Sequence, residues 1–399
     1  MNAADARAVA RDGAASSADA SKTAGCYVHL PFCDRICPYC DFAVVPYARA
    51  RVERYMAALE AEIAQTPPPR CPIGTVFLGG GTPSALAPER LERLLDTLYA
   101  RHGIACGSIE CTLEANPSRS PEHLAAWRRA GVTRLSIGVQ SFDDAELHKL
   151  GRDHDAAQAE AFFREARSAG FASTSIDLIA GVPSQSAASF ARTLDRAVAL
   201  RPDHVSVYAL TIEAGTPFAV WQAREPGAFP EEDAVAEMLV DADARLVAAG
   251  FEHYELSNFA QPGHRCAHNI GYWKQRDCIA YGMSAAGYEN GVRYRNERDF
   301  DTYCRAVESG ASARAETERL DFARRVGEAA MLALRTADGI EDEDFRHRFA
   351  IDPTVAFAGA RKKCSAAGLL EVDGTGARLT PRGRLLANDV CAEFLEPQV

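Results

Sequence analysis

Six short β-type runs alternate with helical stretches between residues 26 and 210, and this alternation constrains the fold more than any other feature of the chain. The short runs are rich in β-branched and apolar residues, whereas the stretches between them have helical spacing of apolar residues. Alternating strands and helices pair the strands in parallel through right-handed crossovers. Six such units are too few to close an eight-stranded barrel. The pattern therefore predicts an α/β fold built on an open (β/α)6 partial TIM barrel.

The predicted strands cover residues 26–30, 75–78, 109–115, 134–139, 174–180 and 204–210. The predicted helices between them cover residues 48–64, 88–101, 121–130, 156–169 and 186–200. In a parallel sheet of this kind, ligands bind at the carboxyl ends of the strands. Residues that carry chemistry are therefore expected directly after a strand.

The barrel core is predicted to span residues 25–215, and two further segments follow it. Residues 216–315 form a connecting segment with one helix at 231–249, followed by a turn-rich stretch that contains the hexapeptide HNIGYW. Residues 316–399 are predicted as several helices, a short hairpin at 373–376 and a last helix. This order is typical of a smaller α+β, winged-helix-like domain.

Charge and composition exclude several classes of protein. The net charge of −11 argues against broad binding to a nucleic-acid backbone, so we expect the winged-helix-like domain to pack or to bind a partner instead. No apolar run is long enough to predict a transmembrane helix. Residues 1–24 lack the apolar core of a secretion signal and are predicted to be a disordered leader. Most of the twelve cysteines stand alone in apolar or helical surroundings, which is not a disulfide framework and predicts a reducing cytoplasm.

Three cysteines, Cys33, Cys37 and Cys40 of CDRICPYC, directly follow the first predicted strand. Thiolates are soft ligands that suit iron–sulfur clusters and zinc. A Cys-x3-Cys-x2-Cys loop can hold three corners of a cubane [4Fe–4S] cluster and leave the fourth iron open. Zinc is the alternative, with His29 or Cys26 as the fourth donor, because structural zinc sites are closed and four-coordinate. Three unrelated thiols are the remaining possibility.

The stretch CYVHLPFCDRICPYC, residues 26–40, resembles the cluster loop of the radical S-adenosylmethionine (radical SAM) family. Its Tyr-x-His-x-Pro start is similar to the coproporphyrinogen III oxidase-like branch of that family. The resemblance extends over roughly residues 25–395. It implies a [4Fe–4S] cluster on the three cysteines, with the amino and carboxylate groups of SAM bound to the open iron.

Polar and glycine residues follow the other predicted strands in turn. Gly80, Gly81 and Thr82 follow the second strand, and their backbone could approach a zwitterionic ligand or simply form a turn. Glu114, Gln140 and Asp177 lie in or at the ends of later strands, and Arg152 lies in a loop, where each alone could be a capping or surface group. The resemblance implies that these positions contact SAM, with looser matches at two of them. The predicted SAM-binding residues are Tyr27, Tyr39, Gly80, Gly81, Thr82, Glu114, Gln140, Arg152, Asp177 and Ala209.

The hexapeptide HNIGYW contains four candidate haem-binding residues, His268, Asn269, Tyr272 and Trp273. Neutral imidazole is a good axial ligand for haem iron, and aromatic rings can flank a flat macrocycle. Asn269 could bind a propionate or orient the histidine. The alternative is an ordinary core histidine beside two core aromatic residues. His264 and Cys266 are further candidate iron ligands.

The branch of the family that this sequence resembles contains two functional types: oxygen-independent oxidases of porphyrin biosynthesis, and HemW-type haem chaperones. The oxidases continue the cysteine loop with a further Cys-x-Cys step, whereas Asp41 and Phe42 follow Cys40 here. HNIGYW matches the HN-x-x-YW motif of the chaperone type. The resemblance therefore implies a haem chaperone that passes haem to acceptor proteins, with membrane-associated respiratory enzymes as the expected class. It also allows a homodimer. A radical SAM oxidase is the alternative, and no catalytic residue is predicted.

Overall fold

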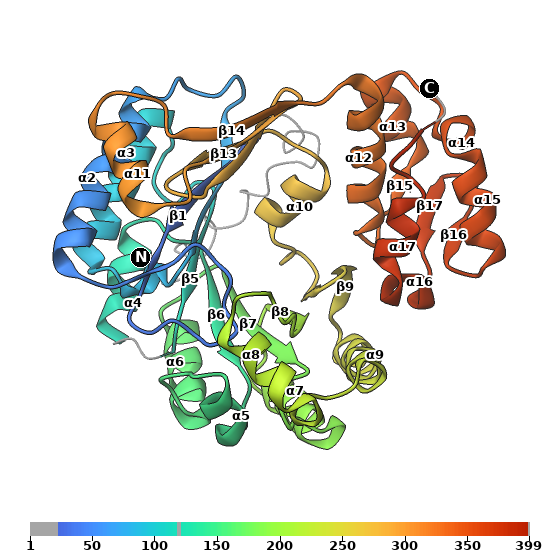
Figure 1. The fold of residues 1–399 in the computed structure, drawn as a ribbon, viewed down its shortest axis with the longest axis horizontal. Helices are drawn as coiled ribbons and strands as arrows, with labels where there is room; N and C mark the ends of the chain where they lie inside the picture. Colours follow the sequence, from blue (N-terminus) through green and yellow to red (C-terminus); the bar gives the residue numbers. More distant parts are fainter. Residues whose placement is uncertain (1–22, 118–120, 398–399) are drawn as a thin grey trace, which may run out of the picture.

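A single curved sheet of twelve strands forms the wall of the molecule within residues 23–117 and 121–397, which the computed structural model describes (Figure 1). The strand order is β14-β13-β12-β11-β1-β4-β5-β6-β7-β8-β10-β9. The strands from β11 to β8 in this order are parallel to one another, and the pairs outside them are antiparallel. The sheet stays open, as the sequence predicts for a partial barrel.

All six predicted parallel strands are present: β1 (Ala24–Leu30), β4 (Ile73–Gly80), β5 (Glu110–Ala115), β6 (Arg134–Gln140), β7 (Ser173–Ala180) and β8 (His204–Ala209). One further parallel strand, β11 (Cys278–Tyr281), pairs with β1 and was not predicted. The segment predicted as a connection thus supplies strands to the same sheet. Its other strands are β9 (Glu252–Glu255), β10 (Asn258–Ala260), β12 (Ala286–Glu289) and β13 (Val292–Asn296). Strand β14 (Arg314–Arg319) forms one edge of the sheet and β9 forms the other.

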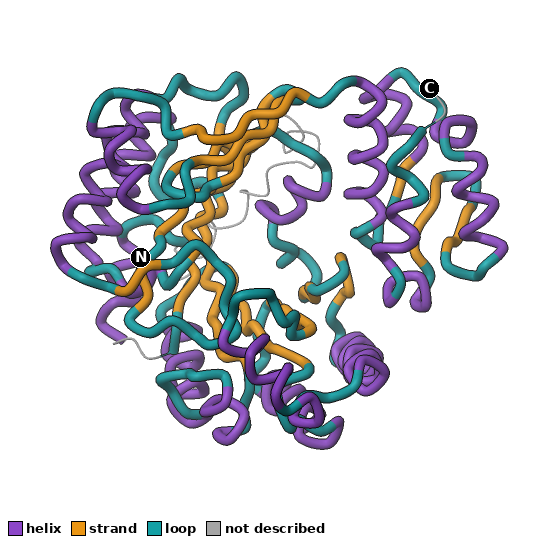
Figure 2. The backbone as a smooth tube through the Cα atoms, in the orientation of Figure 1, coloured by secondary structure: helices purple, strands orange, loops and turns teal. Residues whose placement is uncertain are grey.

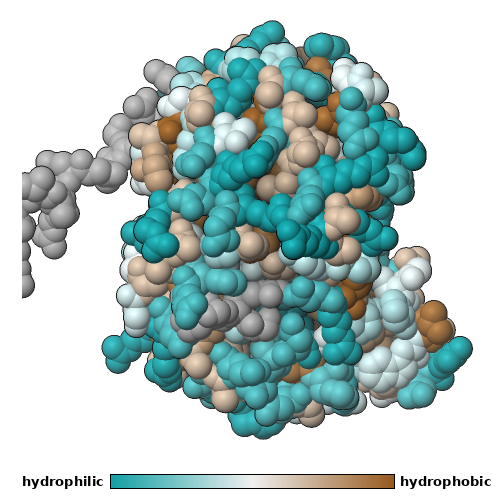
Figure 3. Space-filling model, turned by 90° about the vertical axis from the view of Figure 1, so that its left-hand side faces the viewer, coloured by the Kyte–Doolittle hydropathy of each residue, from teal (hydrophilic) through white to brown (hydrophobic). Residues whose placement is uncertain are grey.

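Helices cover the outer, convex face of the sheet (Figures 1 and 2). The predicted ones are present as α2 (Arg49–Gln65), α3 (Pro88–His102), α4 (Pro121–Arg129), α6 (Ala156–Ser168), α7 (Ala187–Ala199) and α9 (Glu232–Ala248). Helix α3 buries Leu91, Leu94, Leu95 and Leu98, whose spacing places them on one helical face. The surface on the side that carries α2 and α3 is mostly hydrophilic, with scattered hydrophobic residues (Figure 3). Amphipathic helices therefore shield the apolar sheet on this side.

Side chains alternate between the two faces of β1, and this alternation separates the core from the cavity side. Cys26, Val28 and Leu30 are completely buried in the main hydrophobic core. Tyr27 and His29 point to the opposite, concave face, because successive side chains of a strand point in opposite directions. The concave face is therefore the one that can carry polar site residues.

The C-terminal residues form a smaller α+β unit with a core of its own. It contains α12 (Phe322–Leu334), α13 (Asp342–Phe349), α14 (Pro353–Ala356), α15 (Ala358–Ala366), α16 (Pro381–Leu385) and α17 (Ala387–Ala392). Strands β15 (Ile340–Glu341), β16 (Leu370–Val372) and β17 (Gly376–Leu379) form a three-stranded sheet, and the hairpin lies where it was predicted. Buried Val326, Phe345, Leu370 and Phe394 belong to this second core. The predicted fold class is thus confirmed for both parts.

The stretch around HNIGYW is more regular than the predicted turns. Besides β9 and β10 it contains the short helix α10 (Ala267–Trp273), which packs against β1, β4 and α12. Figure 1 shows α10 between the sheet and the C-terminal unit. Most of the predicted leader, residues 1–22, lies outside the described residues. Among the described helices, none combines the length and the apolar character needed to span a bilayer.

Candidate functional site

A cavity of about 520 Å³ lies on the concave face of the sheet and contains most of the predicted site residues in its wall. It extends from the cysteine loop at the carboxyl ends of the strands to Asn269 of α10 at their amino ends. The predicted residues that line it are Cys33, Cys37, Tyr39, Cys40, Gly80, Gly81, Thr82, Glu114, Gln140, Arg152, Asp177, Ala209 and Asn269. The expectation that chemistry follows the strands thus agrees with the positions of these residues.

The three cysteines lie on a tight loop that begins in β2 (Phe32–Cys33), which pairs with β3 (Val45–Pro46). The backbone N–H of Cys40 donates to the carbonyl oxygen of Cys37 at 3.1 Å. Two donors reach the sulfur atoms: the hydroxyl of Thr82 is 3.6 Å from Sγ of Cys33, and Nη1 of Arg152 is 3.6 Å from Sγ of Cys37. Such donors stabilise thiolates, which are the form that binds metal. Burial raises the pKa of Cys33 to about 11, so metal binding at this loop would release a proton.

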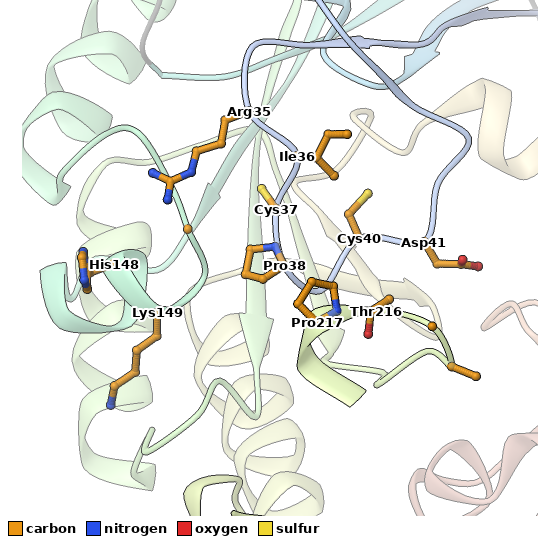
Figure 4. Close-up of a pocket in the computed structure, with 13 residues that line it drawn as sticks. Arg35, Ile36, Cys37, Pro38, Cys40, Asp41, His148, Lys149, Thr216 and Pro217 are labelled. Carbon is orange, nitrogen blue, oxygen red and sulfur yellow. The ribbon is translucent and has the colours of Figure 1, made fainter. Parts of the chain in front are cut away.

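The outer side of the loop is visible in Figure 4, where a second cavity of about 640 Å³ lies against Pro38 and Pro217. In this view the sulfur atoms of Cys37 and Cys40 both point upward, away from Pro217. The carbonyl oxygen of Pro38 accepts the backbone N–H of Phe218 at 3.1 Å, which anchors the loop to α8 (Pro217–Arg224). The loop is thus fixed at its outer side, while these two sulfur atoms point away from that anchor.

The donor set suits a cluster better than a single zinc ion. Within the described ranges, no three or more His, Cys, Asp or Glu side chains are arranged to hold one metal ion. Cys26 cannot serve as the fourth zinc donor because it points into the helix-covered core. Both ring nitrogens of His29 are engaged, one with the hydroxyl of Tyr27 at 3.1 Å and one with the carbonyl oxygen of Ala43 at 2.8 Å. Three cysteines without a fourth donor fit a cubane cluster with one open iron.

The glycine turn after β4 lies against the cysteine loop. The N–H groups of Gly81 and Thr82 donate to the carbonyl oxygens of Leu30 and Phe32, at 2.9 and 2.8 Å. A Cβ atom on Gly81 would lie 2.7 Å from the carbonyl carbon of Pro31 and 2.8 Å from the oxygen of Phe32. Only glycine allows this approach, so the turn holds the backbone of the cysteine loop in place.

Two acidic side chains, Glu114 and Asp177, line the middle of the cavity. Oε2 of Glu114 accepts the N–H of Gly80 at 3.1 Å. Burial raises the pKa of Glu114 to about 7, and the negative charge of Asp177 adds to the rise. Burial also raises the pKa of Asp177, which the hydroxyl groups of Ser136 and Ser206 oppose by donating to it at 2.9 and 2.7 Å. These two carboxyl groups could accept hydrogen bonds from ligand hydroxyl or amine groups.

Arg152 lies beside the cysteine loop with its guanidinium held in place. Its Nη2 donates to Oδ1 of Asn116 at 2.6 Å and to the carbonyl oxygen of Gly138 at 2.7 Å. Gln140 ends β6 with a φ of +70°, a left-handed conformation that is uncommon outside glycine and clusters at functional sites. Arg152 could pair with a ligand carboxylate near the cysteines.

Several residues of the cavity wall were not predicted from the sequence: Phe77, Asn116, Arg134, Ser136 and Ser206. The positions of several of them could have been inferred from the alternation of side chains between the two faces of each strand. Arg134 and Ser136 of β6 share a face with Gly138, which pairs with the predicted Asp177 of β7. Residues on the same face of a strand as a predicted site residue could therefore have been predicted to line the cavity as well.

His268 is buried at the amino ends of the strands, with 3% of its surface exposed, and both ring nitrogens have partners. Nδ1 is 2.8 Å from the hydroxyl of Thr75, and Nε2 is 3.2 Å from the hydroxyl of Tyr272. Burial lowers the pKa of His268 to about 3, and the charge of Arg134 contributes, so the ring is neutral at physiological pH. In this arrangement iron could reach Nε2 only by replacing Tyr272.

The other residues of the hexapeptide differ in their surroundings. Tyr272 is partly exposed and packs edge-on against His268, with ring centroids 4.9 Å apart. Trp273 faces the C-terminal unit, where the guanidinium of Arg335 lies 6.0 Å from the centroid of its ring. Tyr27 does not line the cavity either; its ring stacks on Phe77, which does. The roles predicted for these residues stay predictions.

Comparison with known proteins agrees with this geometry. Residues 27–197 match the Radical SAM superfamily, and residues 323–386 match the HemN C-terminal domain. The protein "Heme chaperone HemW" from Bacillus subtilis is 33% identical over 92% of this chain and 98% of its own length. Its namesake from Mycobacterium tuberculosis is 37% identical over 93% and 94%. The structure of coproporphyrinogen III oxidase (HemN) from Escherichia coli, a radical SAM enzyme, superposes with a TM-score of 0.80 at 26% identity, over 94% of this chain and 90% of that one.

Identity at this level over almost the full length of two relatives is enough to assign a family. The chain therefore belongs to the family of the heme chaperone HemW, within the radical SAM superfamily.

Proposed function

We propose that this protein is a haem chaperone that carries a SAM-binding [4Fe–4S] cluster and transfers haem to acceptor proteins. One observation supports it above all: α10, which carries HNIGYW, closes the amino end of the cavity whose carboxyl end holds the three cysteines. A haem-binding helix and a cluster loop would thus share one cavity. The full-length similarity to proteins named heme chaperones supports the same function.

Cys33, Cys37 and Cys40 would hold the cluster, and its open iron would bind the amino and carboxylate groups of SAM. The turn at Gly81 and the guanidinium of Arg152 lie beside these cysteines and would orient that end of SAM. Further along the wall, the predicted SAM-binding residues would contact the remainder of the molecule. Together, the bound cluster and SAM would supply one-electron chemistry at this end.

His268 would bind haem iron through Nε2 after Tyr272 swings away from it. Thr75 would keep its hydrogen bond to Nδ1 and so set the orientation of the ring, as the outer partners of ligating histidines do. Tyr272 is partly exposed, and its movement would break the contacts of its hydroxyl with His268 and with Sγ of Cys278. The acceptors would be haem proteins such as membrane-associated respiratory enzymes, reached from the cytoplasm, where all twelve cysteines could remain free thiols as they are here.

Haem titration of the reconstituted protein tests this proposal. We expect stoichiometric binding with a shifted Soret band, and His268→Ala should weaken binding at least tenfold and change the axial-ligand spectrum. The exposed histidine of α13 provides a matched control, and His347→Ala should bind haem like the unchanged protein. Failure of the unchanged protein to bind haem stoichiometrically would contradict the proposal.

A radical SAM oxidase is the second candidate, favoured by the close similarity of the whole fold to coproporphyrinogen III oxidase. The structural neighbour contains both the barrel and the C-terminal unit, so overall shape does not separate the two functions. An anaerobic assay with coproporphyrinogen III, SAM and a reductant does. Decarboxylated product would establish the oxidase, whereas haem binding without product supports the chaperone.

A further inference from the structure

Arg134 is a buried cation at the amino end of the cavity. It is the first residue of β6, lines the cavity and has only 3% of its surface exposed. Its Nε has no hydrogen-bond partner. Over the described ranges, its guanidinium forms neither an ion pair nor a side-chain hydrogen bond. A buried guanidinium without a direct hydrogen-bonded partner is unfavourable, so we expect an anion to bind there.

Three acidic groups interact electrostatically with Arg134, namely Glu110, Glu114 and Asp177, and each is engaged elsewhere. Oε2 of Glu114 accepts the N–H of Gly80. The carboxylate of Glu110 accepts the backbone N–H groups of Ala267 and His268, both at 2.9 Å, at the start of α10. That of Asp177 accepts hydroxyl groups from serine side chains on β6, β7 and β8. None of the three lies within ion-pair distance of Arg134. The guanidinium is thus left to interact with whatever enters the cavity.

The cavity has a cationic group at each end, and they are too far apart to serve one small ligand group. Arg152 lies beside the cysteine loop and contacts Cys37. Arg134 starts β6 and Gln140 ends it, so about 20 Å of extended backbone separates the two ends. A SAM molecule on the cluster would place its carboxylate near Arg152. The other end, next to Asn269 of α10, is left for a different carboxylate.

We propose that Arg134 and Asn269 form a carboxylate-binding site at the amino end of the cavity, which receives a propionate group of haem. The inference rests on the proposed haem chaperone function and adds the group that would recognise the haem periphery. A guanidinium binds a carboxylate through paired N–H donors, and the amide nitrogen of Asn269 adds a further donor. The site would orient haem that is bound to the neighbouring His268.

The test compares haem with haem dimethyl ester, in which both propionates are neutral. Anaerobically reconstituted protein is titrated with each ligand, and the ratio of the two dissociation constants is measured. We expect the unchanged protein to prefer haem at least tenfold. Arg134→Gln should remove most of this preference by weakening haem binding and leaving ester binding nearly unchanged. Arg134→Lys, which retains the charge, should keep part of it, and the exposed Arg192→Gln should keep all of it.

A second variant covers the case in which Arg134→Gln fails to fold. Asn269→Asp is nearly isosteric and places a negative charge beside the proposed propionate, so it should weaken haem binding and spare the ester. Equal affinity of the unchanged protein for haem and ester would overturn the site while leaving the chaperone function intact. Equal weakening of both ligands in each variant would also overturn it. Absence of any haem binding by the unchanged protein would instead remove the proposed function itself.

Discussion

At the scale of single residues, Gly81 shows how the close approach of two backbone segments holds the neighbouring cysteine loop in position. A methyl group at this position would lie within 2.8 Å of the backbone of Pro31 and Phe32, next to Cys33. We expect Gly81→Ala to displace the cysteine loop and to lower the free energy of unfolding by about 1–3 kcal/mol, as overpacking does. The content of iron and sulfide after reconstitution should fall, and denaturant unfolding should report the stability loss.

The control for this substitution is a glycine without close neighbours. A Cβ atom added to Gly359 of α15 would meet no atom within 4 Å, and the φ angle of this residue is not positive. Gly359→Ala should leave cluster content unchanged and keep or slightly raise stability, because alanine favours a helix. If Gly81→Ala bound as much iron as the control variant, the proposed support of the loop by the glycine turn would be wrong.

The neutral state of His268 makes a prediction about pH. Its pKa in the folded protein is about 3, against an ordinary value near 6.5. Haem affinity should therefore stay level between pH 5 and pH 8, because the free ring is neutral throughout this range. An exposed histidine ligand would lose affinity about 30-fold by pH 5. Haem titrations at several pH values distinguish the two cases, and a fall that follows a pKa of 6.5 would argue against His268 as the ligand.

The lowered pKa of His268 also predicts how the free energy of unfolding changes with pH. A lowered pKa in the folded state means that the contribution of His268 is present above pH 6.5 and is lost as pH falls toward about 3. Substitution by a neutral isostere such as His268→Gln should therefore reduce the acid sensitivity of the ligand-free protein. Urea unfolding at pH 5 and pH 7 provides the measurement. An unchanged pH dependence would mean that the ring is not buried in solution.

At the scale of elements, α10 was not predictable from its own sequence. Cys266 precedes the helix and offers no side-chain cap, and the helix is only seven residues long. Its first N–H groups are instead bound by Glu110, which lies more than 150 residues earlier in the chain. Local propensity does not reveal a cap that comes from a distant strand. The predicted strands, by contrast, could be identified because each has its signal within its own residues.

Removal of this distant cap should loosen α10 selectively. We expect Glu110→Ala to lower stability by about 1–2 kcal/mol, the usual effect of losing an N-terminal cap. Hydrogen exchange should become faster at 267–273, and haem binding should weaken while cluster content stays constant. Asp352→Ala is the matched control, since Asp352 caps α14 in the C-terminal unit. Unchanged exchange in α10 after Glu110→Ala would exclude Glu110 as its stabilising cap.

At the scale of the whole molecule, the sequence pattern predicted the six parallel strands of the barrel but not the strand β11 that joins them. The parallel strands and outer helices alternate regularly, so each could be located, whereas β11 is short and joins β1 only through the tertiary fold. The cysteines, glycines and acidic residues of the cavity could be predicted because they follow strands. Arg134 was not predicted, since a charged residue at the start of a strand ordinarily faces solvent, although its position along β6 places it on the cavity face. It lines the same cavity as Asn269 of α10, which comes from a distant part of the chain.

Two separate hydrophobic cores lead to a prediction about unfolding. One core joins the sheet to its outer helices, and the other lies within the C-terminal unit. A few backbone hydrogen bonds connect the parts, including Leu256 N–H to the oxygen of Arg335 at 3.1 Å and Ala337 N–H to the oxygen of Tyr254 at 2.9 Å. We therefore expect calorimetry of the cluster-loaded protein to resolve two transitions, of which SAM stabilises only the one that belongs to the barrel.

The size of this shift follows from ligand linkage. At about 100 times the dissociation constant, SAM should add about 2.7 kcal/mol to the barrel, which raises its Tm by roughly 4 °C. The transition of the C-terminal unit should keep its Tm. Cys33→Ser should lose the proposed cluster together with its open iron, and SAM should then shift neither transition. A single transition that moves as a whole would show that the two cores unfold together. In that case the hydrogen bonds at Leu256 and Tyr254 would couple the barrel to the C-terminal unit strongly enough to prevent either part from unfolding alone.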